Sequence, residues 1–228
     1  MCNLYNVSPK EEFERYVRKQ FRIGWEPHTV GPFQHGVFIR TGAANDIEAV
    51  DGQWGMIAPR SKGRRPDSRA ILTNNARIES IAERFTYRDS WKAGRRCLIP
   101  AIWYQEPNWE TGKNIWWRLQ RADGAPWALA GIWSEWTDPA TGEIVPNFSM
   151  ITCNCDGHPL LGRLHKPDPK LPDDAQDKRA VAHIGREQWE QWFHGSTDEA
   201  MELIHPQPIE AFDLADAQRT DHALAART

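Results

Sequence analysis

The sequence has no long hydrophobic run. Its 228 residues contain no stretch of about eighteen apolar residues, so no membrane-spanning helix is predicted. The N-terminal segment also lacks the apolar region of a secretory signal, because charged residues begin at Lys10, Glu11 and Glu12. We therefore expect a cytoplasmic protein without a membrane partner.

Cysteine is scarce as well. Four cysteines are too few to suggest a disulfide framework, and a reducing cytosol would keep a reactive thiol reduced. Cys153, Cys155 and His158 bring three metal-binding side chains close together in the sequence, but a structural zinc site needs a second ligand pair. The sequence therefore predicts no metal site and no cofactor.

An excess of positive charge is missing too. The formal net charge is −3, so net charge does not indicate a nucleic-acid partner. The local distribution is more informative, because basic residues cluster at Arg60, Lys62, Arg64 and Arg65. Such a cluster is either a surface for a polyanion or an ordinary solvated charge run.

Tryptophan, in contrast, is abundant. The chain has 12 tryptophans, and many of them fall between residues 103 and 136. Most are expected in the core, because indole rings bury large areas. A minority could serve as stacking platforms for the bases of single-stranded nucleic acid.

Short apolar runs separated by turn residues predict strands in the middle of the chain. The expected strands cover residues 37–40, 53–57, 96–99, 115–120, 127–133 and 148–152. Helices are expected at 8–21 with Ser8 as N-cap, at 75–85 with Asn75 as cap, and at 159–165, 186–193 and 198–204. Strands grouped between helices predict an α+β fold with a curved, antiparallel, barrel-like sheet and flanking helices.

A single domain is expected. A chain of this length with 40% hydrophobic residues can build one core, which we place at residues 2–205. The segment 206–228 is predicted to be a weakly ordered C-terminal tail with Ala-rich helical fragments. We expect the protein to be a monomer.

Cys2 directly follows Met1. Methionine aminopeptidases remove the initiator when the next side chain is small, which would leave a cysteine with a free α-amine. The amine, with a pKa of about 7.7–8.0, can condense with an aldehyde to an imine, and the thiol can then close a five-membered thiazolidine ring. The alternative is that a cysteine stands here by accident of the start of the reading frame.

Three other segments contain candidate site residues. Asn75 and Arg77 combine an amide with a cation, which suits an anion such as phosphate, although an ordinary helix cap with a surface arginine fits too. Glu106 ends a hydrophobic strand, where desolvation would raise a carboxyl pKa toward proton transfer, whereas an exposed loop glutamate is the alternative. His165 follows an apolar turn and is either an acid/base group or a structural histidine at a helix end.

In this order the four segments resemble the SRAP family, the SOS response-associated peptidases or abasic site processing proteins. The resemblance covers residues 2–195 and rests on Met1-Cys2, on Asn75-Ala76-Arg77 followed by Glu79, on Arg96-Cys97-Leu98-Ile99-Pro100-Ala101 with Glu106, and on Leu164-His165. It implies an SRAP-like fold and a sensor of abasic sites in single-stranded DNA. It further implies covalent crosslinking, abasic-site lyase activity and a peptidase activity that exposes Cys2.

The family's catalytic roles carry over to four residues as expectations. Cys2 would supply the amine and the thiol, and Asn75 would position the amine and the adjacent backbone. Glu106 would act as the acid/base in imine formation and ring closure. His165 would move protons on the sugar during ring opening and crosslink reversal.

The resemblance also implies DNA-binding residues. Arg77 would bind a phosphate, Thr152 would line the same pocket, and Trp54 of a Trp-Gly pair would help to shape the DNA cleft. The expected partner is single-stranded DNA containing abasic sites. Such a partner would place the protein at the nucleoid during DNA damage.

The chain departs from the family pattern in two places. Many members continue the N-terminal cysteine with Gly-Arg, whereas Asn3-Leu4 follow here, so Arg60 and Arg64 are candidates for the missing phosphate contact. Members commonly read His-Asp-Arg-Met-Pro after the histidine, while residues 165–172 here read His-Lys-Pro-Asp-Pro-Lys-Leu-Pro.

Two other functions fit the same residues. An N-terminal nucleophile amidohydrolase or peptidase would use Cys2 with its amine as base and form an acyl-enzyme, without a DNA adduct. A non-catalytic single-strand binder would use the tryptophans and the basic loop, and Cys2 would be dispensable.

Overall fold

A computed structural model describes residues 2–42, 46–68 and 70–215 of the chain. A ten-stranded sheet contains β1 (Tyr5–Val7), β2 (Thr29–Val30), β3 (His35–Thr41), β4 (Ile47–Trp54), β5 (Asn75–Arg77), β6 (Arg96–Asn108), β7 (Ile115–Gln120), β8 (Trp127–Thr137), β9 (Ile144–Asn154) and β10 (Arg179–Val181). The α-helices in the described residues are α1 (Lys10–Val17), α2 (Arg88–Lys92), α3 (Trp189–His194) and α4 (Thr197–Glu202). The 3₁₀ helices are η2 (Ile78–Ser80), η3 (Leu161–Arg163), η4 (Arg186–Gln188) and η5 (Ile209–Ala211).

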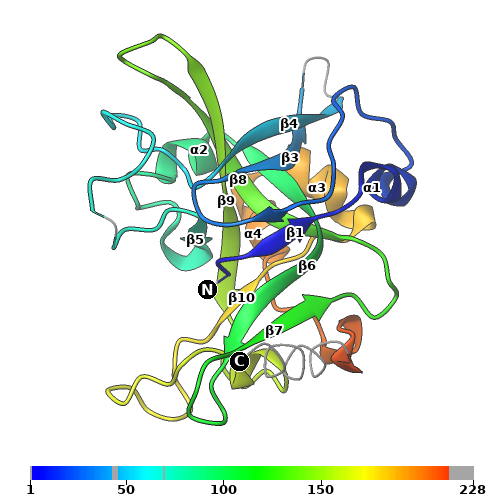
Figure 1. The fold of residues 1–228 in the computed structure, drawn as a ribbon, viewed down its shortest axis with the longest axis vertical. Helices are drawn as coiled ribbons and strands as arrows, with labels where there is room; N and C mark the ends of the chain where they lie inside the picture. The colour runs from blue at the N-terminus through cyan, green and yellow to red at the C-terminus, as the bar shows by residue number, and fades with distance from the viewer. Residues whose placement is uncertain (1, 43–45, 69, 216–228) are drawn as a thin grey trace.

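Five strands form a closed ring at the centre of the sheet (Figure 1). β3 pairs with β4 and β6, β6 with β8, and β8 with β9, all antiparallel, and a parallel pairing of β4 with β9 closes the ring. β1 and β7 add to β6, whereas β5 and β10 add to β9. The predicted α+β, barrel-like fold is confirmed, with a mixed sheet because β5 also runs parallel to β9.

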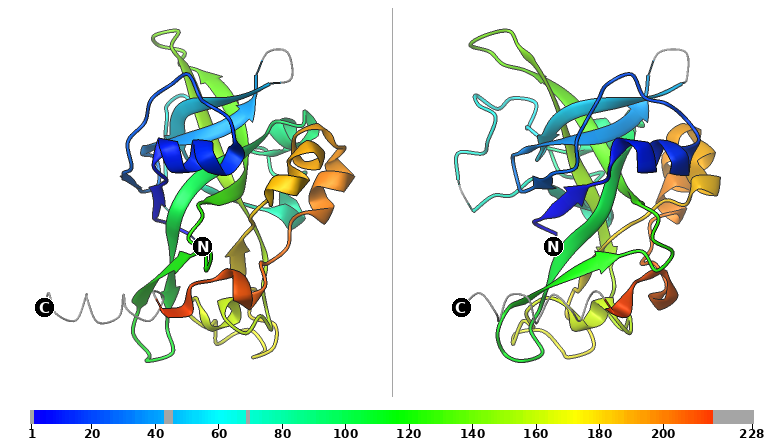
Figure 2. Two further views of the ribbon diagram at one scale, coloured as in Figure 1. Left: turned by 90° about the vertical axis from the view of Figure 1, so that its right-hand side faces the viewer. Right: turned by 45° about the vertical axis from the view of Figure 1, so that its right-hand side comes forward.

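The first halves of β6 and β8 are buried on both faces, which explains their continuous apolar sequences. One face lines the barrel, and the other is covered by α3 and α4, which lie together on one side of the barrel (Figure 2). The indole Nε1 of Trp192 in α3 donates to the Cys97 carbonyl in β6 at 3.1 Å. A side chain on Gly131 of β8 would come within 2.9 Å of Cys97 Sγ and the Ser149 carbonyl, so the strands can approach only at a glycine.

Helices α1 and α3, far apart in the sequence, contact each other. Phe13 of α1 stacks on Trp189 of α3 with ring centroids 6.2 Å apart.

No helix within the described residues is long and apolar enough to cross a bilayer. Five of the six strand predictions are confirmed, and residues 115–120 match the bounds of β7. The predicted strand at 53–57 is wrong in part, because β4 ends at Trp54 and Gly55 has a positive φ of 142°.

Two helix predictions are wrong in part. Helix α1 begins after Pro9, and Ser8 does not cap it, because the Ser8 backbone continues β1 and donates to the Pro100 carbonyl at 3.2 Å. The helix ends at Val17, where Arg18 adopts a left-handed conformation with φ 56°. Residues 159–165 contain only the short 3₁₀ helix η3.

The predicted helix at 75–85 is also wrong. Residues 75–77 form strand β5, and only the single 3₁₀ turn η2 follows. Ala76, Ile78 and Ile81 are buried as the pattern predicted, but Ala82 is exposed. A strand followed by a turn buries the same three residues as a helix would, so the apolar spacing could not distinguish the two structures.

The predicted weakly ordered tail needs correction up to residue 215. Phe212 is 4% exposed and lies 5.4 Å from the Trp127 ring, centroid to centroid. The backbone N–H of Asp213 donates to the Gln120 carbonyl at 3.0 Å, and Ala122 donates to Ala211 at 3.0 Å. This segment therefore belongs to the packed fold, whereas residues 216–228 lie outside the described part of the chain.

Replacing Phe212 tests this correction. We expect Phe212→Ala to lower the free energy of unfolding by about 3–5 kcal/mol, because a buried aromatic ring is lost. Leu214→Ala is the control, since Leu214 is 42% exposed, and should change stability by less than about 0.5 kcal/mol. Urea denaturation measures both, and equal small effects would show that the segment does not stabilise the fold.

Candidate active site

Cys2 lies three residues before the start of strand β1 and is fully buried. Its Sγ donates to the Leu4 carbonyl at 3.4 Å, and Tyr5 pairs with Tyr104 of β6. Burial raises the pKa of the Cys2 thiol well above its usual range, and the nearby Glu106 carboxylate raises it further. The thiol is therefore protonated at neutral pH.

Two neighbouring asparagines hold the backbone of Cys2. The carbonyl oxygen of Cys2 accepts from Asn74 Nδ2 at 3.0 Å and from Asn75 Nδ2 at 2.7 Å. Asn75 is placed by the pairing of β5 with β9, and the Tyr87 hydroxyl donates to its carbonyl at 3.1 Å. The sequence indicated Asn75 but not Asn74, although the repeated asparagine at 74–75 was a usable signal.

The amide oxygens of both asparagines have no hydrogen-bond partner among the described residues. Because both Nδ2 groups donate to the Cys2 carbonyl, Asn74 Oδ1 and Asn75 Oδ1 point elsewhere. Each oxygen can accept a hydrogen bond from an incoming donor. The pair thus fixes the main chain of Cys2 and leaves two acceptors beside it.

Glu106 and His165 lie together at the far end of β6. Glu106 is 1% exposed, and its Oε2 is 3.6 Å from His165 Nδ1. The His165 N–H donates to the Pro107 carbonyl at 2.6 Å, and a bridge between Asn108 and Leu164 continues this pairing. The end of one strand therefore carries the carboxyl group and anchors the segment that carries the imidazole.

The hydrogen bond at the other nitrogen sets the tautomer of His165. Nε2 lies 2.8 Å from the Arg179 carbonyl, which can only accept, so Nε2 carries a proton. Burial lowers the pKa of His165 although the Glu106 carboxylate acts in the opposite direction. In the neutral ring, Nδ1 therefore presents its lone pair toward Glu106.

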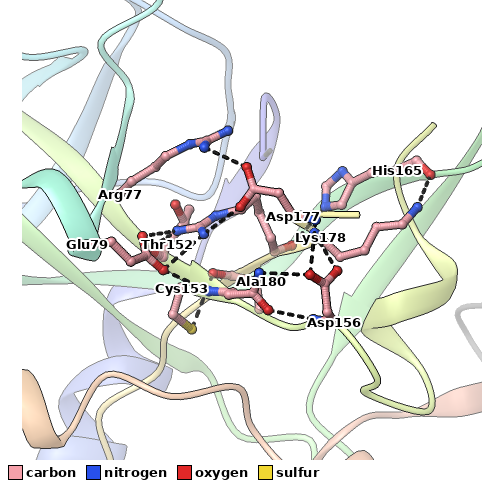
Figure 3. A network of polar contacts seen from close by, with 11 residues as sticks. Arg77, Glu79, Thr152, Cys153, Asp156, His165, Asp177, Lys178 and Ala180 are labelled. Carbon is pink, nitrogen blue, oxygen red and sulfur yellow. Dashed lines mark hydrogen bonds and ion pairs between the residues drawn. The ribbon is translucent and has the colours of Figure 1, made fainter. Parts of the chain in front are cut away.

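Arg77 and Thr152 lie opposite each other in the paired strands β5 and β9. Arg77 Nη1 donates to Asp177 Oδ2 at 2.6 Å, and both side chains are partly exposed (Figure 3). Thr152 is fully buried, and its Oγ1 has no partner among the described residues. Arg77 is thus the member of this pair that a solvent-borne ligand can reach.

Three predicted DNA-binding residues are not placed at this site. Trp54 is fully buried and packs edge-on against Tyr5 at 5.0 Å, so it supports β1 and cannot contact DNA directly. Arg64 Nη2 pairs with Glu143 in the β8–β9 turn at 2.5 Å, and Arg60 is an exposed loop residue. No described contact joins Arg60 or Arg64 to Cys2.

Cys153 and Cys155, the two cysteines of the C-x-C segment, are buried in the fold. Burial raises the pKa of Cys153 to about 11 and of Cys155 to about 12. His158 Nδ1 accepts from the backbone N–H of Leu160 and Leu161 at 3.1 and 2.9 Å. Within the described residues, no group of three histidine, cysteine or acidic side chains could hold a metal ion.

Comparison with solved structures shows the same fold. A crystal structure of a Bordetella bronchiseptica protein is 29% identical, with a TM-score of 0.79 over 93% of this chain and 97% of that chain. A Bacteroides thetaiotaomicron protein, at 22% identity, has a TM-score of 0.71 over 93% of this chain and 90% of that chain.

Sequence relatives agree with this result. The abasic site processing protein HMCES of Xenopus tropicalis is 23% identical over 68% of this chain and 48% of the relative. The protein of the same name from Pongo abelii is 24% identical over 74% of this chain and 52% of the relative. The chain thus spans about half the length of these curated relatives. The family model of the SOS response associated peptidases matches residues 1–220, and the chain belongs to this SRAP family.

Proposed function

We propose that this protein processes abasic sites in single-stranded DNA by forming a covalent link through Cys2. The observation that carries the proposal is the main chain of Cys2 held by Asn74 and Asn75, with Glu106 near enough to raise the pKa of its thiol. Family membership and the names of the relatives support the choice of an abasic site as substrate.

The chemistry needs no oxidant or reductant. Removal of Met1, by the protein itself or by an aminopeptidase, frees the α-amine of Cys2. The amine nitrogen adds to the C1′ aldehyde of the ring-opened sugar, and loss of one water gives an imine. Cys2 Sγ then adds to the imine carbon, the thiol proton moves to nitrogen, and a thiazolidine results.

The state of the thiol favours this order of steps. An α-amine with a pKa of about 7.7–8.0 is partly unprotonated at neutral pH, whereas the buried thiol is protonated. The amine is therefore the better first nucleophile. An acyl-enzyme mechanism, as in the amidohydrolase alternative, would instead need a thiolate at the start.

Glu106 and His165 would move the protons. Imine formation requires a proton for the departing water, and ring closure requires a proton to leave sulfur for nitrogen. Once one of the two groups has taken a proton from the reactants, Glu106 Oε2 and His165 Nδ1, 3.6 Å apart, can pass it between them after a small movement. We assign these transfers to Glu106, and sugar ring opening and crosslink reversal to His165.

Arg77 would bind a phosphate of the DNA strand. Its partner Asp177 is 40% exposed, and exposed ion pairs contribute only about 0–1 kcal/mol, so a phosphate can displace the carboxylate. Arg77 lies two residues beyond Asn75 on the same strand. The DNA backbone would thus pass close to the asparagines. We further propose that the protein acts as a monomer in the cytoplasm and joins the nucleoid during DNA damage.

Cys2→Ala tests the covalent step. We expect wild-type protein to form a denaturation-resistant adduct with an abasic single-stranded oligonucleotide, and Cys2→Ala to form none. Cys153→Ala is the matched control, because Cys153 is buried like Cys2 but lies inside the chain, where it has no free α-amine. This variant should crosslink normally. Gel electrophoresis and intact mass measure the adduct and the loss of Met1. Equal crosslinking by Cys2→Ala would refute the mechanism.

Glu106→Gln separates chemistry from binding. We expect adduct formation to slow by about 10²–10⁴-fold, since an acid/base group is lost. Affinity for an oligonucleotide with a tetrahydrofuran abasic analogue, which has no aldehyde, should stay unchanged. Glu110→Gln is the control, because Glu110 lies just after the end of the same strand β6, is exposed and pairs with Arg163. A parallel loss of affinity and rate in Glu106→Gln would make Glu106 a structural residue.

Arg77→Gln tests the phosphate contact. Losing one contact to single-stranded DNA should weaken binding and reduce the slope of log affinity against log salt by about 0.7. Arg84→Gln, a change at an exposed arginine nearby in the sequence, is the control. Fluorescence anisotropy at several salt concentrations measures both slopes, and an unchanged slope for Arg77→Gln would exclude the contact.

A further inference from the structure

His165 has an unusual backbone conformation. Its φ is 66°, in the left-handed region, which costs a residue other than glycine of the order of 1–3 kcal/mol. Such a conformation persists only where the surroundings hold it. On its amino side, the His165 N–H donates to the Pro107 carbonyl at 2.6 Å.

Lys178 holds the other side of the same peptide segment. Its Nζ donates to the His165 carbonyl at 2.7 Å (Figure 3). The same Nζ donates to the Leu164 carbonyl at 2.8 Å. The residue is 8% exposed. The ammonium therefore binds the two carbonyl groups that flank the left-handed residue.

Burying the Lys178 ammonium to bind two carbonyl groups costs desolvation free energy. A buried ammonium is unfavourable without close compensation, and burial lowers the pKa of Lys178 although Asp156 acts in the opposite direction. The Asp156 carboxylate accepts from the backbone N–H groups of Asp177 at 3.0 Å and Lys178 at 2.9 Å. Asp156 thus anchors residues 177–178, the strap that leads into β10 and from which the lysine side chain extends.

Arg179 completes the arrangement. Its guanidinium binds both oxygens of Glu79 at 3.0 and 2.7 Å and the Thr152 carbonyl at 2.9 Å. These contacts, with the pairing of β10 to β9, fix the main chain of Arg179. Its carbonyl then receives Nε2–H of His165 at 2.8 Å.

We propose that Lys178 is a positioning residue for the reaction proposed above, on which this inference rests. Its ammonium holds the His165 peptide in the left-handed conformation that directs Nε2–H to the Arg179 carbonyl and Nδ1 to Glu106. Without the ammonium, the Leu164 and His165 carbonyls lose their donor. The segment then relaxes, and the ring no longer keeps one tautomer and one orientation.

The test compares Lys178→Met, Lys178→Arg and Lys170→Met in the full chain. Methionine keeps the length of the side chain without a donor, arginine keeps the two donors, and Lys170 is an exposed lysine of the loop after His165. Long-range ¹H–¹⁵N NMR correlations of the His165 ring report its tautomer. Single-turnover adduct formation reports the rate, and the tetrahydrofuran oligonucleotide reports affinity.

We expect wild-type His165 to carry its proton on Nε2 and Lys178→Met to show a mixture of tautomers. Adduct formation by Lys178→Met should fall at least about tenfold, with affinity within about twofold of wild type. Lys178→Arg should restore most of the rate, and Lys170→Met should match wild type. Lys178→Leu, which also has no donor, takes the place of Lys178→Met should that variant not fold, with the same expected mixture of tautomers and loss of rate.

Two results would overturn the proposal. One is a proton on Nδ1 in the wild-type protein, and the other is a Lys178→Met variant with the wild-type tautomer and rate. Failure of the proposed function gives a different result, because wild-type protein would then form no adduct at all. The tautomer comparison between wild type and Lys178→Met still decides the role of Lys178 in that case.

Discussion

The pairing of β9 with four other strands is the constraint on which the site depends. Its parallel pairing with β4 closes the barrel, and its pairing with β8 continues the central sheet. Near the end of β9, β5 pairs with one of its edges and β10 with the other. Arg77 of β5 and Val181 of β10 therefore both pair with Thr152 of β9. The strand that brings Asn75 to Cys2 and the strand whose carbonyl orients His165 are thus fixed by one partner.

Burial favours the neutral form of two groups to which the proposed reaction assigns roles, the Cys2 thiol and the His165 imidazole. It raises the pKa of the Cys2 thiol and lowers that of the His165 imidazole, so both are neutral at physiological pH. A neutral thiol and a neutral imidazole can each take part in a proton transfer without first losing a counterion. The proposed condensation releases water and ends without a change in net charge, so neutral groups suit it.

The sequence predicted the parts of this site that depend on local pattern. The apolar run at 96–99 predicted the strand that leads to Glu106, although β6 extends to Asn108, whereas the helix predicted at 159–165 is only a 3₁₀ turn. The strand conformation of Asn75 could not be predicted from local pattern, because β5 forms by pairing with Met150 and Ile151, which are far away in the chain. Lys178 was missed because it acts on the backbone carbonyls of Leu164 and His165, and no residue pattern records such a contact. Asn74 acts on the Cys2 carbonyl in the same way, and only its place beside Asn75 in the sequence pointed to it.

The same contacts explain why the unusual loop after His165 need not displace it. Residues 166–175 are mostly exposed, and Gln176 holds the loop by hydrogen bonds to Asp168, Leu171 and Pro172. His165 itself is held through Pro107, Lys178 and Arg179, none of which belongs to that loop. Its position is therefore set by β6 and by the strap that leads into β10. The sequence of the loop can change while the imidazole still faces Glu106.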